Sequence, residues 1–180
     1  MKVITLYIGL DVHKDSITLA IAEPGSKGEI RLFGSITHDL GRLEVALRRI
    51  LKAHPGAQLE VAYEAGPCGF VIARRLKQLG ISCLVAAPSL IPKAPGSPFK
   101  TDKRDARAIA RLLRAGELTA VYIPEPTDEA IRDLCRARTD AVDDLRRCRH
   151  RLKGFLLRHG YRYQGKANWS QPHNDCCFLP

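Results

Sequence analysis

The sequence has no apolar run that approaches the roughly 20 residues of a membrane-spanning helix, and no two of its six cysteines have the CxxC spacing. Without such pairs we expect no zinc site. Four cysteines stand singly in apolar surroundings, and we expect them to be buried free thiols in the reducing cytoplasm: Cys68, Cys83, Cys135 and Cys148. The chain is therefore expected to be a cytoplasmic protein with no membrane partner.

Acidic residues are few for the number of basic ones. The 180 residues include 29 Lys and Arg against 19 Asp and Glu, which gives a formal net charge of +10. Such an excess favours a polyanionic partner, above all nucleic acid. A basic protein with charge scattered over its surface would have the same composition, so the charge needs support from particular residues.

Hydrophobic periodicity predicts an α/β fold. The first three predicted strands are joined by short turns, which favours an antiparallel meander, and the later ones alternate with helices. This order predicts a mixed five-stranded sheet with helices on its faces. The predicted strands are 3–12, 16–22, 29–36, 58–65 and 81–87, and the predicted helices are 39–53, 67–80 and 102–115. Residues 88–100 contain four prolines and predict a surface loop.

Four acidic residues are the candidates for chemistry. Asp11 and Glu64 each end a buried strand, whereas Asp102 and Asp105 lie three residues apart on one helical face. A buried carboxylate is costly unless it is paired or metal-bound, and Mg²⁺ prefers oxygen ligands. Two such ions about 3.5–4 Å apart clamp the attacking and leaving oxygens of a phosphodiester. We therefore expect these four to be catalytic Mg²⁺ ligands, with Glu60, on the same strand face as Glu64, as an alternative.

Simpler explanations exist for each of these acids. An Asp at a strand end often begins a turn, and an Asp in the first turn of a helix meets the helix dipole favourably. The second explanation covers Asp102 well and Asp105, at the head of an apolar stripe, less well.

Residues 128–158 carry a heptad seam, apolar except for one arginine, at alternating spacings of three and four, which predicts a long coiled-coil helix. The seam is Ile131, Leu134, Arg138, Ala141, Leu145, Cys148, Leu152 and Phe155. We expect it to pair with a second copy and form a homodimer or a higher homo-oligomer. The alternative is a long helix that packs on its own domain.

Two groups of basic residues are candidates for binding nucleic-acid phosphates. One runs along the helix 102–115 and the other lies in an acid-free part of the long helix. The first group is Arg104, Arg107 and Arg111, followed by Arg114 on the same face. The second group is Arg146, Arg147, Arg149, Arg151 and Lys153. A solvated basic face remains the alternative for both groups.

Three stretches together resemble a known family: YIGLDVHKDSITLAI, EVAYEAGPCGFVIARRLKQLGI and KTDKRDARAIARLLRAGEL. In this order they are similar to the N-terminal half of the DEDD transposases of bacterial insertion sequences, the IS-one-ten group, described as bridge-RNA-guided recombinases. The resemblance implies an RNase H-like (RuvC-like) domain over 1–126. Within it, the four acids would be the Mg²⁺ ligands. The coiled-coil helix over 127–160 would dimerise the protein and help to hold the guide RNA.

The family also has a C-terminal domain with a nucleophilic serine, which would lie beyond Pro180. Residues 161–180 depart from the family pattern after about Trp169, so we expect a truncated or irregular tail. The expected function is that of a partial insertion-sequence transposase, with Mg²⁺-dependent and RNA-guided binding, cleavage and recombination of DNA. Two alternatives stay open: a non-catalytic dimeric nucleic-acid-binding remnant, and a stand-alone Mg²⁺-dependent structure-selective nuclease.

Overall fold

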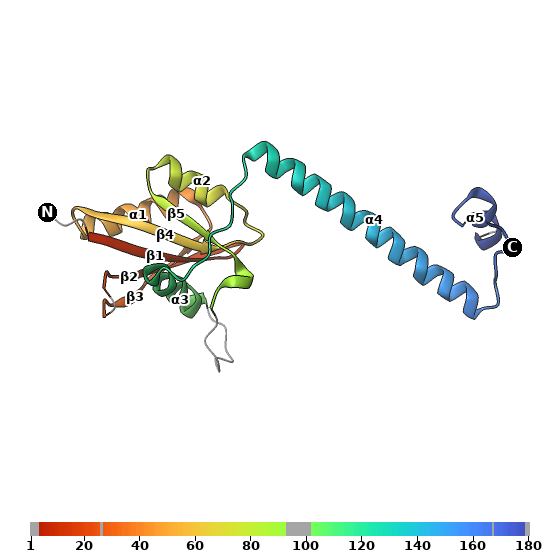
Figure 1. The fold of residues 1–180 in the computed structure, drawn as a ribbon, viewed down its shortest axis with the longest axis horizontal. Helices are drawn as coiled ribbons and strands as arrows, with labels where there is room; N and C mark the ends of the chain where they lie inside the picture. The colour runs from red at the N-terminus through yellow and green to blue at the C-terminus, as the bar shows by residue number, and fades with distance from the viewer. Residues whose placement is uncertain (1–3, 26, 93–101, 167, 179–180) are drawn as a thin grey trace. The chain divides into compact units, whose positions relative to one another are not determined.

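The computed structural model describes residues 4–25, 27–92, 102–166 and 168–178, with the backbone alone at 102–103 and 176–178 (Figure 1). The chain divides into two compact units, Met1–Ile123 and Pro124–Pro180. The first holds a sheet with helices, and the second holds a long helix followed by a short one.

Within the described residues of the first unit, five strands form one mixed sheet in the order β3-β2-β1-β4-β5. The strands are β1 (Ile4–Val12), β2 (Ser16–Ala22), β3 (Ile30–Thr37), β4 (Ala57–Glu64) and β5 (Ser82–Ala86). β1, β2 and β3 pair antiparallel, whereas β4 pairs parallel to β1 and β5 parallel to β4. This confirms the predicted antiparallel meander within a mixed five-stranded sheet, as expected for the RNase H-like fold that the resemblance implies.

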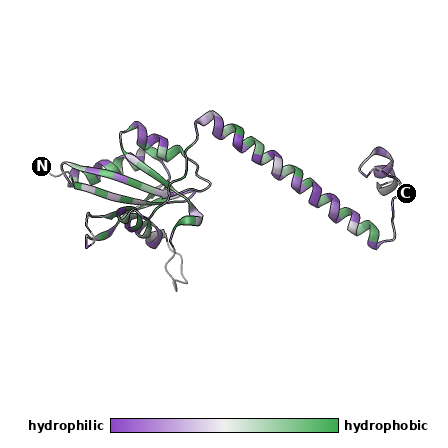
Figure 2. Cartoon of the chain, in the orientation of Figure 1, coloured by the Kyte–Doolittle hydropathy of each residue, from purple (hydrophilic) through white to green (hydrophobic). Residues whose placement is uncertain are grey.

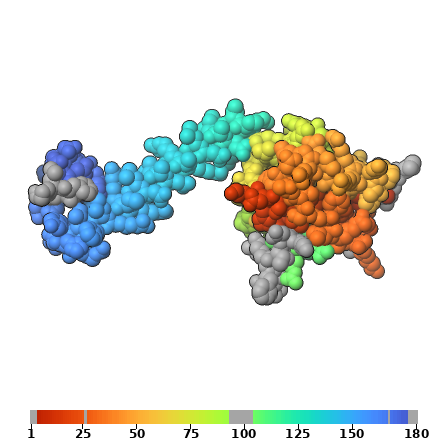
Figure 3. Space-filling model, turned by 180° about the vertical axis from the view of Figure 1, so that it is seen from behind, coloured from red at the N-terminus to blue at the C-terminus, as the bar shows by residue number. Residues whose placement is uncertain are grey.

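One face of the sheet carries the main apolar core. Side chains alternate across a strand, so Leu6, Ile8 and Leu10 of β1 share one face, and all three are fully buried. They pack with helices α1 (Leu40–Ala53) and α2 (Val71–Gln78) on that face (Figure 1). Residues of α1 cover it in the view from behind (Figure 3).

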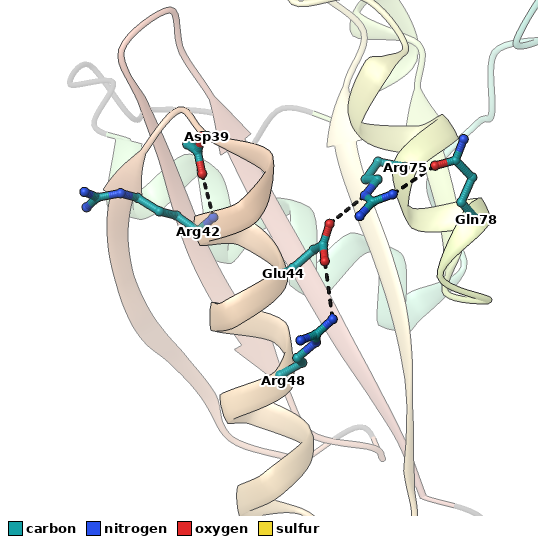
Figure 4. Close-up of polar contacts among 6 residues, drawn as sticks. All are labelled: Asp39, Arg42, Glu44, Arg48, Arg75 and Gln78. Atoms are coloured by element: carbon teal, nitrogen blue, oxygen red, sulfur yellow. Dashed lines mark hydrogen bonds and ion pairs between the residues drawn. The ribbon is translucent and has the colours of Figure 1, made fainter.

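Polar contacts fix how α1 begins and how it meets α2 (Figure 4). The backbone N–H of Arg42 donates to Asp39 Oδ1 at 2.8 Å, so Asp39 caps the first turn. Arg75 Nε of α2 donates to Glu44 Oε1 at 2.5 Å, and Arg48 lies 3.5 Å from the other carboxylate oxygen. The Glu44 carboxylate, only 13% exposed, therefore links the two helices.

Helix α3 (Asp102–Ala115) covers the opposite face and lies very close to β1. A Cβ built on Gly9 would overlap the carbonyl oxygen of Ala106 and the backbone nitrogen of Ala110. Both alanines are fully buried, together with Ala20 and Ala22 of β2. The glycine and the alanines thus permit a backbone approach that larger side chains would prevent.

The start of α2 differs from the prediction. The sequence predicts a helix from residue 67, but the structure begins it at Val71. Gly69 adopts a left-handed φ of 63°, and its carbonyl accepts a hydrogen bond of 2.9 Å from the hydroxyl of Tyr63. Residues 67–70 therefore form a turn tied to the sheet.

The loop predicted over 88–100 contains a 3₁₀ helix at Pro88–Leu90, and residues 93–100 lie outside the described part. In the following connector, Ala120 forms an isolated antiparallel bridge with Ala86 of β5.

None of the four cysteines expected to be buried free thiols is fully buried. Cys135 and Cys148 are exposed on the long helix, whereas Cys68 and Cys83 are half-buried in the first unit. Burial raises the pKa of the Cys83 thiol to about 12. This thiol therefore stays protonated at neutral pH.

The second unit begins with the long helix α4 (Pro126–Arg158), in which polar and apolar residues alternate (Figure 2). None of its residues is buried. Part of the tail expected to be irregular forms a short helix, α5 (Gln171–Phe178). In the part of the chain that the structure describes, no helix is both long and apolar enough to cross a membrane.

Candidate functional site

Asp11 and Glu64 lie side by side at the carboxyl ends of two parallel strands. The register of β1 and β4 ends with the pair Leu10↔Tyr63, so Asp11 and Glu64 are the next neighbours. Two residues earlier, Gly9 of β1 and Ala62 of β4 face α3. Because side chains alternate along a strand, Asp11 and Glu64 share the α3 face of the sheet.

The direction of α3 brings its first turn toward the same end of the sheet. Ala106 lies against Gly9, and Arg114 donates to the carbonyl oxygens of Glu23 and Gly28 at 3.0 and 2.7 Å. Those two carbonyls belong to the β2–β3 turn, which lies toward the amino end of β1. Helix α3 thus runs antiparallel to β1, and half-buried Asp105 precedes Ala106 toward the Asp11 end.

The carboxylate of Asp11 is only 15% exposed and lies 3.0 Å from Nε2 of His13. The backbone of His13 is fixed by a further hydrogen bond, in which His38 Nδ1 donates to the His13 carbonyl oxygen at 2.6 Å. The sequence pattern predicts only a turn at residues 13–15 and gives no role to this histidine. The available signal is the i, i+2 spacing at a strand end, which places both side chains on one face.

Glu60, the alternative acid, lies farther back on β4. It pairs with Tyr7 and Ser82, four residues before Glu64, which is about 13 Å along a strand. Glu64 is exposed at the strand end and Glu60 is half-buried. The register therefore favours Glu64 as the partner of Asp11.

The donor set suits a hard cation, because all four predicted ligands are carboxylates. The assembled geometry is incomplete. The side chain of Asp102 lies outside the described residues, and among the described ones no three His, Cys, Asp or Glu side chains are grouped so that they could hold a metal ion. The structure thus brings Asp11 and Glu64 together and directs α3 toward them, while the four-ligand centre stays a prediction.

The arginines of α3 divide into two kinds. Arg104, Arg107 and Arg111 are exposed, as a phosphate-binding surface requires. Arg114 is half-buried and donates to the β2–β3 turn, so it has a structural role.

The basic residues of α4 are exposed and partly paired. Arg146 and Arg147 form ion pairs of 3.0 and 3.1 Å with Asp143 and Asp144, two acids directly before the acid-free stretch. Exposed pairs of this kind are weak, so they leave the arginines able to bind phosphate. Arg149 stacks over the ring of Trp169 at 5.1 Å. Arg151 and Lys153 are exposed as well.

The predicted seam of α4 is only partly exposed to solvent. Ile131 and Leu134, in its first half, are 62% and 71% exposed. In its second half, Leu145, Cys148 and Leu152 line a cavity of about 430 Å³ together with Trp169 and Asn174 of the tail. The tail therefore shares part of the surface that was predicted to pair with a second copy. Dimerisation stays a prediction.

Comparisons with known proteins agree on one family. A family model described as a transposase, for the DEDD transposases of the IS110 type, matches residues 8–160. The chain is 44% identical over 164 residues to y4qE of Sinorhizobium fredii, a protein provisionally named a transposase, and this match covers 91% of the chain and 42% of the relative. It is 39% identical over 156 residues to the transposase for insertion sequence element IS1533 of Leptospira borgpetersenii, covering 85% and 44%.

The chain thus spans less than half the length of these curated relatives. Among solved structures, that of RuvC from Thermus thermophilus is similar with a TM-score of 0.42 and 14% identity. This match covers 64% of this chain and 99% of that one.

Proposed function

The chain belongs to the DEDD transposases of the IS110 type, and we propose that it supplies the metal-dependent DNA-cleaving part of an insertion-sequence transposase. The observation that carries the proposal is the meeting of Asp11 and Glu64 at adjacent strand ends, with the first turn of α3 running toward them on the same face.

Asp11, Glu64, Asp102 and Asp105 would hold the cation, which we take to be Mg²⁺. When bound, it would supply positive charge to the oxygens of the reacting phosphodiester. The chain's own residues prepare this site. His13 orients the Asp11 carboxylate from 3.0 Å, and the close contact of Ala106 with Gly9 fixes the position of Asp105. Arg104, Arg107 and Arg111, exposed along α3, would bind phosphates beside the cleaved bond.

The second unit would bind nucleic acid and a second copy of the chain. We assign the exposed basic residues 146–153 of α4 to phosphate contacts, with a structured guide RNA as the partner that the family implies. The seam over 128–158 would form the homodimer. We assign recombination to the whole transposase, because the relatives extend well beyond the part that this chain matches.

A non-catalytic nucleic-acid-binding protein is the second candidate. The observation in its favour is that no three potential ligands are grouped among the described residues. Strand cleavage that depends on Mg²⁺ and on Asp11 would exclude this candidate.

The experiment is a cleavage assay on branched and duplex DNA with and without Mg²⁺. It compares Glu64→Gln with Glu60→Gln, a matched control on the same face of the same strand. Metal-assisted charge stabilisation is worth several kcal/mol, so Glu64→Gln should slow cleavage about 100-fold or more, whereas Glu60→Gln should cleave as the wild type does. Equal rates for the two variants, or cleavage without a divalent ion, would contradict the proposed site.

A further inference from the structure

The second unit contains a cavity of which the proposed function uses only one residue, Lys153. It lies where the last turns of α4 meet the segment after it, and its volume is about 770 Å³. Cavities of about 300–1,000 Å³ are typical of small-molecule sites. None of the described residues that line it is acidic, and Lys153 and Arg162 are among them. The cavity is therefore suited to an anionic ligand.

One wall of the cavity is aromatic and well packed. The rings of Tyr163 and His173 meet edge-to-face at 4.7 Å, and Trp169 lies 4.9 Å from His173, which is only 2% exposed. A Cβ built on Gly165 would overlap the ring and hydroxyl of Tyr163, so the glycine is needed for this arrangement. The wall is thus formed before any ligand arrives.

Tyr161 differs from these packed rings. It lines the same cavity but is 63% exposed, so much of its ring is not covered by the protein. The amide of Gln164 also lines the cavity and can both donate and accept hydrogen bonds. An open aromatic face, an amide and two cations together suit a ligand with a flat ring, hydrogen-bonding edges and a negative charge.

We propose that this cavity binds one unpaired nucleotide of a single-stranded nucleic acid. The base stacks on Tyr161 and meets Gln164 at its edge, and the adjoining phosphate contacts Lys153 and Arg162. Stacking on aromatic side chains combined with basic phosphate contacts is how proteins hold single strands. The inference rests on the proposed function in one respect, because it takes α4 to carry nucleic acid to this place.

The test uses the full chain and short single-stranded oligonucleotides that contain 2-aminopurine, whose fluorescence is quenched on stacking. Tyr161→Ala is compared with Tyr122→Ala, which removes a tyrosine that is 74% exposed in the first unit. Tyr161→Ala should weaken binding about 5- to 150-fold, the usual range for one stacked base, and abolish the quenching. Tyr122→Ala should change neither.

A second comparison tests the phosphate contact. Arg162→Ala is matched with Arg49→Ala, an exposed arginine of α1. Only Arg162→Ala should lower the slope of log affinity against log salt, by about 0.7 for a single strand. Oligonucleotides of RNA and DNA with one sequence distinguish the two sources of an unpaired nucleotide. Tighter RNA binding would assign the cavity to RNA, and equal binding would assign it to single strands in general.

Failure of this inference can be told apart from failure of the proposed function. If Tyr161→Ala binds and quenches as Tyr122→Ala does, the nucleotide site is overturned, even where the basic residues 146–153 still bind RNA. If the wild type binds structured RNA but no single strand, the site is overturned as well. Alanine at Arg146, Arg147, Arg149 and Arg151 separates the two, because none of these four is among the described residues that line the cavity. If that variant binds as the wild type does while Tyr161→Ala weakens binding, the cavity stands and the proposed role of the four arginines fails.

Discussion

Replacing Gly9 by alanine tests the contact on which the whole site depends. The added methyl would overlap backbone atoms of Ala106 and Ala110 in α3, and backbone atoms cannot give way as a flexible side chain does. Removing this overlap therefore requires α3 to move away from β1. Overpacking of this kind costs about 1–3 kcal/mol, and we expect the upper end of that range because both partners belong to a helix packed along its length.

The expected change is large enough for a simple assay. For a domain of this size, 1 kcal/mol corresponds to roughly 3–5 °C in Tm, so Gly9→Ala should lower the melting temperature of the first unit by about 10 °C. Circular dichroism during heating measures it. The matched control is Gly66→Ala in the same unit, where the nearest heavy atom to an added Cβ is 3.9 Å away.

The same substitution should also impair cleavage at temperatures where the protein is folded. Moving α3 separates Asp105 from Asp11 and Glu64, so activity should fall more than the loss of folded protein explains. If Gly9→Ala melts within about 1 °C of the control and cleaves DNA normally, the close approach of α3 is not what positions the site.

Three further predictions concern the seam, the basic residues and a half-buried thiol. Leu145→Asp should dissociate the dimer in light scattering, whereas Val142→Asp, equally exposed but off the seam, should not. A wild-type chain that is monomeric at micromolar concentration would contradict pairing along the seam. Alanine at Arg146, Arg147, Arg149 and Arg151 should weaken structured-RNA binding and flatten its salt dependence. Unchanged binding would contradict this and would leave the exposed arginines of α3 as the candidates for the phosphate contacts. Because burial raises the pKa of the Cys83 thiol to about 12, the folded state keeps a proton that the unfolded state loses at lower pH. Stability should therefore fall as pH rises above about 9, and urea unfolding at rising pH should show a smaller fall in Cys83→Ala; equal pH profiles would refute this.

The strands and the position of Asp11 could be predicted from sequence because they depend on local patterns. The run before Asp11 is largely apolar, and the pairing of β1 with β2 follows from two buried strands joined by a short turn. Hydrophobic periodicity likewise predicted the helix over 102–115, which the structure has as α3. For these elements, local propensity and tertiary packing favour the same structure.

What was missed depends on contacts between residues far apart or on short-range pairing that periodicity does not encode. Helix α2 begins late because Tyr63 binds the carbonyl of Gly69. The tail covers part of the seam through Trp169, which no repeat in the sequence indicates. The contact of His13 with Asp11 could not be predicted, because it depends on how two side chains at a strand end are oriented, and only the structure shows that orientation.

The most direct test of the central claim is a crystal structure of the chain grown with Mg²⁺. We predict an ion bound by oxygens of Asp11 and Glu64 together with Asp102 or Asp105 from α3, at Mg²⁺–oxygen distances of about 2.0–2.1 Å. A structure at saturating Mg²⁺ with no ion there, and with Asp102 and Asp105 pointing into solvent away from Asp11, would contradict it.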